Sequence, residues 1–329
     1  MILQFALFLF GLALLLAGAH MLVDGSSKLA GSLGVSRLFI GLTVVAFGTS
    51  APELAVNIQA ALSGKTDIGF GNIVGSNIGN IGLIIGVCAL LRPLTIEGIL
   101  VRREIPMMIL VTLAGLVLGF DTLLRTGPGI YDRFDGLMLL LLFGIFMFYT
   151  VAGVLRKETI DPLLEQTTQK AASGIQRKLS ANLALSGLGL IMLILGAHLS
   201  TGSAVHLSKS LGVPPAVVGL SLVALGTSLP ELVTSVVATW KGHTDLAVGN
   251  IVGSNIFNLG FIQGLTALIK PVAVPKGGLA DLWVMMGFAA LLLPFAITDR
   301  LRIVRWEGGV LLTAYAGYMT IRFLSMPSP

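Results

Sequence analysis

The stretch Gly48-Thr49-Ser50-Ala51-Pro52-Glu53 lies inside an apolar segment that is long enough to cross a lipid bilayer. Pro52 has no backbone N–H, so the helical hydrogen bond to the carbonyl of Gly48 cannot form, and the proline ring crowds that turn. Glu53 places a carboxyl group at membrane depth, where ionisable residues are costly and by default indicate a functional site. The stretch therefore predicts a broken membrane helix that offers carbonyl, hydroxyl and carboxylate oxygens, the ligands that hard cations prefer.

The composition is that of a polytopic membrane protein. The 329 residues are 55% hydrophobic and only 11% charged, with a mean hydropathy of +0.92, whereas soluble proteins carry about 25% charged residues. The net charge of +5 comes from basic residues scattered through short loops, so it does not indicate nucleic-acid binding. Cys88 is the single cysteine and lies in an apolar run, which excludes a disulfide framework and a thiolate metal site.

Apolar windows of about 20 residues predict membrane-spanning helices along the whole chain. The ten windows are 2–22, 38–62, 70–91, 104–121, 135–155, 181–201, 215–240, 248–269, 280–298 and 307–324. The first window resembles a signal peptide at Ala17-Gly18-Ala19, but no positive charge precedes it, so we expect it to be retained. The longest polar interval, 156–178, divides the chain into two halves of five spans each.

The two halves are related by duplication. A shift of 178 residues places Gly41–Asn80 on Gly219–Asn258 without a gap, with 23 of the 40 positions identical. The opening stretch returns in this way as Gly226-Thr227-Ser228-Leu229-Pro230-Glu231. Because each half has an odd number of spans, the second inserts upside down relative to the first. We therefore predict an all-α membrane protein in which ten transmembrane helices form two inverted-topology repeats, 1–155 and 179–329, joined by a connector at 156–178.

A second repeated block follows each broken segment. It reads Gly-Asn-Ile-Val-Gly-Ser-Asn-Ile-Gly-Asn over Gly71–Asn80, and Phe257 replaces the last glycine in the copy over Gly249–Asn258. On a helix Ser76 and Asn80 share one face, as do their counterparts Ser254 and Asn258. The other amides of the blocks either join the cation site or only hold helices together by hydrogen bonds; these are Asn72, Asn77, Asn250 and Asn255.

Inverted symmetry would bring both broken helices and both blocks together near the membrane midplane. The cavity between them would hold Glu53, Glu231, amides and hydroxyls, but no cysteine or histidine, so soft metals are poorly served. Such a site suits Ca²⁺, or Na⁺ ions in its place, better than Mg²⁺, which demands strict octahedral geometry.

The positive charges predict the orientation. If the N-terminus is outside, the cytoplasmic loops carry 14 of the 21 Lys and Arg residues, as the positive-inside rule requires. We therefore expect both termini outside and the 156–178 connector in the cytoplasm.

The doubled Gly-Thr-Ser-x-Pro-Glu and Gly-Asn-x-x-Gly-Ser-Asn motifs resemble the alpha repeats of the sodium/calcium exchanger family, within the cation/Ca²⁺ antiporter superfamily, prokaryotic type. The resemblance covers essentially the whole chain, with alpha-1 and alpha-2 motifs at 41–80 and 219–258. It implies a plasma (inner) membrane protein and alternating access by sliding of the first and sixth spans. The implied ion ligands are Glu53, Glu231, Thr49, Ser50, Thr227, Ser228, Ser76, Asn80, Ser254, Asn258 and the carbonyls of Ala46 and Ala224.

One departure from the resemblance concerns Asn80 and Asn258. Several relatives, including potassium-dependent ones, carry Asp at one of the two corresponding positions, which places K⁺ co-transport in question here. The large cytoplasmic Ca²⁺-sensing domains of animal relatives are absent, so we expect no regulation of that form.

The sequence thus favours a secondary antiporter that exchanges Na⁺ for Ca²⁺ and normally exports Ca²⁺, with no cofactor and no obligatory protein partner. A Ca²⁺/H⁺ antiporter is the main alternative, because two adjacent carboxyl groups in a low-dielectric site also suit protons. A cation channel is less favoured, since there is no filter-like loop or four-fold repeat. An enzyme is not favoured either, because no extramembrane domain and no nucleophile–base pair is present.

The predicted orientation can be tested by cysteine accessibility. A cysteine at Thr168 in the connector should be protected in intact cells from an impermeant thiol reagent, whereas a cysteine at Ser328 should react. Labelling of the connector and protection of the C-terminus would reverse the predicted orientation.

Overall fold

The computed structural model describes residues 1–120, 129–155, 175–210 and 224–324, and these are almost entirely helical. The first half contains α1 (Ile2–Leu33), α2 (Arg37–Ile40), α3 (Ala46–Thr49), α4 (Ala51–Leu62), α5 (Thr66–Gly79), α6 (Gly86–Leu91), α7 (Ile105–Gly119) and α9 (Arg133–Leu155). The second half contains α11 (Ile175–Ser210), α13 (Ala224–Thr227), α14 (Leu229–Trp240), α15 (Thr244–Ile256), α16 (Gly264–Ile269), α17 (Gly278–Leu301) and α18 (Arg305–Leu324). Four π-helical turns join some of them: η1 (Gly41–Val45), η2 (Asn80–Ile85), η3 (Leu100–Glu104) and η5 (Phe257–Gln263).

Helix occupies all or part of each predicted window within the described residues. Six helices are long and apolar enough to cross a membrane, and the bent pair Arg37–Thr49 and Ala51–Leu62 makes a seventh candidate. The helices α1 and α11 extend well beyond the predicted windows 2–22 and 181–201. The predicted connector falls mostly on residues 156–174, outside the described part of the chain, as do Thr168 and Ser328.

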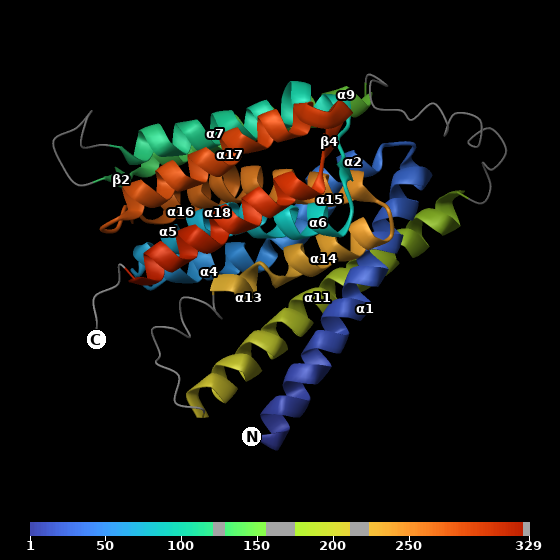
Figure 1. The fold of residues 1–329 in the computed structure, drawn as a ribbon, viewed down its shortest axis with the longest axis horizontal. Helices are drawn as coiled ribbons and strands as arrows, with labels where there is room; N and C mark the ends of the chain where they lie inside the picture. The colour runs from blue at the N-terminus through green and yellow to red at the C-terminus, as the bar shows by residue number, and fades with distance from the viewer. Residues whose placement is uncertain (121–128, 156–174, 211–223, 325–329) are drawn as a thin grey trace.

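The described helices form a central bundle and one peripheral pair (Figure 1). The apolar core of the bundle runs through α5–α7, α9 and α15–α17, and its fully buried residues include Ile78, Ile84 and Ile256. The outer faces are apolar as well; Phe134 and Phe148 on α9 are 60% and 67% exposed. In a membrane protein such faces contact lipid, because only helices with internally satisfied backbones can lie against hydrocarbon.

Short strand pairs connect the two halves at the two ends of the bundle. The strand β1 (Leu94–Thr95) pairs antiparallel with β4 (Arg302–Ile303), and β2 (Ile130–Tyr131) pairs antiparallel with β3 (Val272–Ala273). The strands β1 and β3 follow the corresponding Arg-Pro and Lys-Pro steps of the repeats. Loops that the charge distribution assigns to one side of the membrane are therefore neighbours in the structure.

Ion pairs support the same grouping of loops. The ammonium of Lys241 pairs with Asp24, and Arg37 pairs with Asp245 at 3.3 Å. The first of these contacts ties the end of α14 to α1, and the second ties α2 to the start of α15. Both lie on the side that the charge distribution assigns to the cytoplasm.

The long helices α1 and α11 lie side by side and slant across the edge of the bundle (Figure 1). They approach closely because glycines face the partner backbone. A Cβ on Gly18 would lie 2.7 Å from the carbonyl oxygen of Gly189, and one on Gly196 would lie 2.7 Å from that of Gly11. These two contacts exchange under the 178-residue shift, so the pairing is symmetric. Small residues permit such close packing of membrane helices.

We expect Gly18→Ala to destabilise the protein by about 1–3 kcal/mol, because the added methyl group forces the two backbones apart. The matched control is Gly31→Ala in the same helix, where an added Cβ meets nothing within 4 Å; there alanine should be neutral or stabilising by up to about 1 kcal/mol. Thermal unfolding of the purified proteins in one detergent measures both effects. Equal melting temperatures for the two variants would contradict the close contact.

Candidate functional site

Both predicted helix breaks are present and have the same geometry. The first lies at Ser50, with φ −82° and ψ 7°, and bends the helical path by 43°. The second lies at Ser228, with φ −86° and ψ 6°. In each case the helix restarts with the proline in its first turn, a position where the missing N–H has no helical partner to lose.

The two glutamates also lie in these first turns, Glu53 in α4 and Glu231 in α14. The backbone N–H groups at a helix N-terminus create a partial positive charge that favours a nearby carboxylate. Both side chains are buried, with exposed fractions of 0% and 1%. The proline therefore breaks the helix, and the N-terminus of the helix that follows stabilises the charge of the adjacent glutamate.

Each glutamate accepts a hydrogen bond from the serine at the break in the other half. The hydroxyl of Ser50 donates to Oε1 of Glu231 at 2.9 Å, and that of Ser228 donates to Oε1 of Glu53 at 3.1 Å. These two bonds exchange under the 178-residue shift. The structure thus brings together the four residues at the centre of the predicted site.

The serines of the second block lie beside the glutamates of their own half. Ser76 donates to Oε1 of Glu53 at 3.3 Å, and its hydroxyl oxygen lies 3.0 Å from that of Ser228. Ser254 is buried and lies beside Glu231. Both serines are therefore where the sequence pattern places them.

Asn80 and Asn258 are held by amides of the opposite half. The Nδ2 of Asn80 donates to Oδ1 of Asn255 at 2.9 Å, and that of Asn258 donates to Oδ1 of Asn77 at 3.1 Å. Each of these interactions fixes the NH₂ end of the amide, so the oxygen end points elsewhere. The Oδ1 atoms of Asn80 and Asn258 are buried and have no hydrogen-bond partner.

Asn77 and Asn255 have the helix-joining role that was one of the two alternatives for these amides. Nδ2 of Asn77 donates to the backbone oxygen of Asn255 at 3.1 Å, and the reverse bond is 3.3 Å. The residues therefore form a reciprocal clamp between α5 and α15, and the same side chains orient Asn80 and Asn258.

The threonines of the breaks are held by the remaining amides of the blocks. Thr49 donates to Oδ1 of Asn250 and Thr227 donates to Oδ1 of Asn72, each at 3.1 Å. Sequence reasoning did not foresee these contacts, although the repetition of Asn72 and Asn250 in both blocks is a signal for them. Because each hydroxyl donates its hydrogen to an amide, its oxygen remains available as an acceptor or cation ligand.

One of the two backbone carbonyls that the resemblance implies as ligands keeps its helical hydrogen bond. The carbonyl of Ala46 accepts the N–H of Ser50 at 3.1 Å, and the hydroxyl oxygen of Thr49 lies 3.4 Å from it. Ala224 opens α13 at the corresponding position. A role for these carbonyls as ion ligands stays a prediction of the resemblance.

Four acceptor atoms of the site are buried without a hydrogen-bond donor: Oε2 of Glu53, Oε2 of Glu231, Oδ1 of Asn80 and Oδ1 of Asn258. An unsatisfied buried acceptor costs about 1–3 kcal/mol. These atoms form two symmetric pairs, one from each half. Carboxylate and amide oxygens without donors are suited to a hard cation, which supplies the positive charge that they lack.

Among the described residues, no group of three or more His, Cys, Asp and Glu side chains that could hold a metal ion occurs. The candidate site instead combines two carboxyl groups with neutral oxygens, which is the donor set that the sequence predicted.

Comparison with known proteins finds relatives over most of the chain. The family model described as "Sodium/calcium exchanger protein" matches residues 3–152 and 181–324. The inner membrane protein YrbG of Escherichia coli (strain K12) is 37% identical over 82% of this chain and 81% of its own. The sodium/calcium exchanger MaX1 of Methanosarcina acetivorans is 32% identical over 97% of this chain and 98% of its own.

A solved structure has the same fold over nearly the full length. It is the sodium-calcium exchanger NCX_Mj soaked with zero Na⁺ and Ca²⁺, with a TM-score of 0.83 and 31% identity over 98% of this chain and 99% of that one. Further structures of NCX_Mj, soaked with Na⁺ and either Ca²⁺ or Sr²⁺, match equally well.

We expect Glu53→Gln and Glu231→Gln each to weaken Ca²⁺ binding by more than about tenfold, because a divalent ion loses one of two buried charges where Coulomb terms are large. Isothermal titration of the purified variants with Ca²⁺ measures the effect. The matched control is Asp67→Asn, which makes the same chemical change at an exposed residue in the first turn of α5. Near wild-type affinity in either glutamine variant would disprove the site.

Proposed function

The chain belongs to the sodium/calcium exchanger family, and on that premise we propose that it exchanges Na⁺ for Ca²⁺ across the membrane by alternating access. The normal direction of Ca²⁺ transport is efflux. The observation that carries this proposal is the set of four buried acceptor atoms on Glu53, Glu231, Asn80 and Asn258 that lack a donor. Ca²⁺ bound there neutralises two carboxylates at once, and Na⁺ ions can replace it at the same oxygens.

We propose the same ion ligands as the sequence predicted, and the hydrogen bonds described above divide them into three groups. Glu53, Glu231, Asn80 and Asn258 offer unpartnered oxygens, and Ser50, Ser76, Ser228 and Ser254 surround the carboxylates. Thr49, Thr227 and the carbonyls of Ala46 and Ala224 complete the set at the helix breaks.

The architecture that we propose is ten transmembrane spans in two inverted repeats of five. The hydrogen bonds of the site support it, since each bond from one half has a counterpart from the other under a single shift. The strand pairs support it too, because β1 and β3 lie at equivalent places in the two halves but pair at opposite ends of the bundle. Inverted repeats give a carrier two related arrangements, one open to each side.

Alternating access then requires a part that moves and a part that holds the ions. The pair α1–α11 packs against the bundle through a second apolar cluster, in which Leu15 and Leu22 of α1 meet residues of α11, α2, η1, α14 and α15. Where α1 and α11 touch, glycines of one helix face the backbone of the other, so no large side chains interlock at those points. We propose that this pair slides across the bundle while the glutamates stay in place.

We propose that the protein lies in the plasma (inner) membrane of a bacterium or archaeon, with both termini outside. The match to a protein named as an inner membrane protein supports this location. The sodium/calcium exchanger family consists of transporters, so the buried carboxylates act as ion ligands and not as acid–base catalysts. The Ca²⁺/H⁺ alternative is not favoured by the family membership.

The counter-ion can be tested in reconstituted vesicles. Vesicles loaded with Na⁺ and diluted into Na⁺-free buffer that contains Ca²⁺ should accumulate Ca²⁺, because both ions compete for one site and the Na⁺ gradient makes its occupancy unequal on the two sides. Equal Na⁺ on both sides should suppress net uptake, and Glu53→Gln protein is the matched negative control. Ca²⁺ uptake driven by an acid-inside pH gradient alone, and indifferent to Na⁺, would instead identify a Ca²⁺/H⁺ antiporter.

A further inference from the structure

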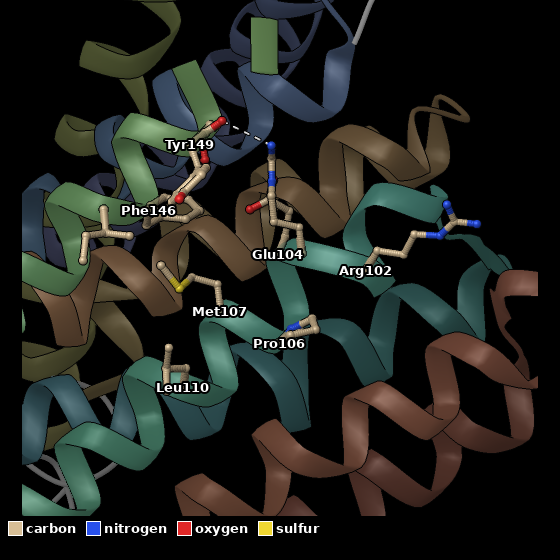
Figure 2. Close-up of a pocket in the computed structure, with 10 residues that line it drawn as sticks. Arg102, Glu104, Pro106, Met107, Leu110, Phe146 and Tyr149 are labelled. Carbon is tan, nitrogen blue, oxygen red and sulfur yellow. Dashed lines mark hydrogen bonds and ion pairs between the residues drawn. The ribbon is translucent and has the colours of Figure 1, made fainter. Parts of the chain in front are cut away.

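Two places outside the proposed ion ligands hold buried polar atoms without a hydrogen-bond partner. One is a cavity of about 380 Å³ between η3–α7 and α9, where Oε2 of Glu104 and Oγ1 of Thr150 lack partners. Its lining is mostly apolar, Glu104 already pairs with Arg103, and the Arg102 side chain points away from α9 (Figure 2). The other place lies between α4 and α5, one helical turn from Glu53, and it has a counterpart in the second half of the chain.

In the second half this place is closed by a hydrogen bond. Glu231 of α14 lies beside Ser254 of α15. One helical turn further along α14, the hydroxyl of Ser235 accepts a hydrogen bond from Nδ2 of Asn250 at 3.0 Å. Both partners are fully buried. The helices α14 and α15 are therefore joined directly beside the carboxyl group.

The corresponding hydrogen bond is not made in the first half. The 178-residue shift places Asn57 on Ser235 and Asn72 on Asn250. Oδ1 of Asn57 and Nδ2 of Asn72 are both buried without a hydrogen-bond partner. The first atom is an acceptor and the second is a donor, so each lacks what the other can supply. Leaving such buried groups unpaired is unfavourable, and the second half avoids it.

Asn57 is held in a different position instead. Its Nδ2 donates to the backbone oxygen of Glu53 at 2.9 Å. Its Oδ1 lies against Gly69 of α5, where an added Cβ would be 2.8 Å from that oxygen. In the second half the residues at these two positions are Ser235 and Ala247. The longer amide therefore occupies space that is open only because α5 has a glycine there.

The two copies also differ in exposure. Asn72 is partly exposed, whereas its counterpart Asn250 is fully buried. At the start of α5 the side chain of Ile68 is 52% exposed, whereas its counterpart Leu246 is fully buried. The structure thus contains an open form of this place in the first half and a closed form in the second half.

We propose that Asn57 is a positioning residue that changes its hydrogen-bond partner as the carrier changes access. Inverted repeats give a carrier two arrangements in which the halves exchange roles. When the first half takes the closed form, Oδ1 of Asn57 leaves Gly69 and accepts a hydrogen bond from Nδ2 of Asn72. The hydrogen bond between Asn250 and Ser235 breaks in the same step. This inference rests on the alternating access proposed above, and it does not depend on which ions are exchanged.

The difference between the two copies favours one access state. The short hydroxyl of Ser235 has a partner in the closed form, whereas the longer Asn57 has a second resting place against Gly69 in the open form. The combination of Asn57 and Gly69 therefore favours the state in which the first half is open. The charge distribution assigns that end of α4 and α5 to the outside of the membrane.

The test uses Ile68→Cys as a reporter in the purified full-length protein. Its thiol should react with a maleimide in the open form and be protected in the closed form, where Leu246 shows the position to be buried. Cys88 is buried, so the wild type without the reporter is the unlabelled control. All variants are labelled in one detergent at one Ca²⁺ concentration.

Asn57→Ser and Asn57→Ala are a matched pair that differs by one hydroxyl group. The introduced serine supplies the acceptor that Ser235 supplies in the second half, and the introduced alanine supplies none. The ratio of protected to reactive protein should be about fivefold higher in Asn57→Ser, which corresponds to about 1 kcal/mol for one hydrogen bond. Asn72→Ala removes the donor and should abolish this difference, as a double-mutant cycle requires for a direct contact.

A further variant tests the resting place of the amide oxygen. Gly69→Ala should slow labelling, because the added methyl group displaces Oδ1 of Asn57 from α5. In the Asn57→Ala background the same change should leave labelling unaltered, since no side-chain oxygen remains to be displaced. Melting temperatures near that of the Ile68→Cys parent show that the variants are folded.

Equal labelling of Asn57→Ser and Asn57→Ala would overturn the proposal, and so would a difference that survives Asn72→Ala. Failure of the ion assignment gives another result. If a Na⁺ gradient drives no Ca²⁺ uptake but labelling follows the pattern above, the proposed exchange is wrong and the partner change of Asn57 stands. Na⁺-driven Ca²⁺ uptake with labelling indifferent to residue 57 would refute the partner change and leave the exchange intact.

Discussion

The structure depends on the exchange of hydrogen bonds between two buried carboxyl groups and the helix breaks of opposite halves. Ser50 donates to Glu231, and Ser228 donates to Glu53. A lone carboxylate in a medium of low dielectric constant would be strongly unfavourable. Each half therefore supplies a donor that the other half needs, and neither half contains a complete site. This mutual dependence explains why a duplicated sequence retains the same six-residue pattern in both copies.

The backbone around the site follows from the same constraint. Proline ends one helical segment and begins the next, so a glutamate falls in the first turn, where the backbone dipole favours its charge. On the neighbouring helices, π-helical turns begin at or next to Asn80 and Asn258, and such widened turns are frequent at functional sites. The reciprocal clamp of Asn77 and Asn255 fixes the two amides from behind. The clamp thus leaves the Oδ1 atoms of Asn80 and Asn258 buried without a donor.

The outer parts of the molecule differ from this rigid centre in their packing. The helices α1 and α11 make backbone-to-backbone contacts through glycine, and they share a second apolar cluster with residues of α2, η1, α14 and α15. The helices α7 and α9 leave a cavity at the polar end of their contact, where the corresponding helices α17 and α18 are joined by Arg322 and Asp281. The two halves are therefore alike around Glu53 and Glu231 but differ between the helix pairs α7–α9 and α17–α18.

The sequence by itself determined the membrane class, the two broken helices and the duplication, and it singled out Glu53 and Glu231 as candidate ion ligands. These features are local, since a proline, a charge in an apolar window or a repeated motif acts through its own chain neighbours. Only the tertiary structure decided which amides join two helices and which keep an oxygen without a donor. Asn77 and Asn80 are three residues apart on one helix, and their different roles depend on how α5 crosses α15. It also decided that Thr49 pairs with Asn250 and that the carbonyl of Ala46 keeps its helical bond, because such contacts are set by helix crossings that no periodicity specifies.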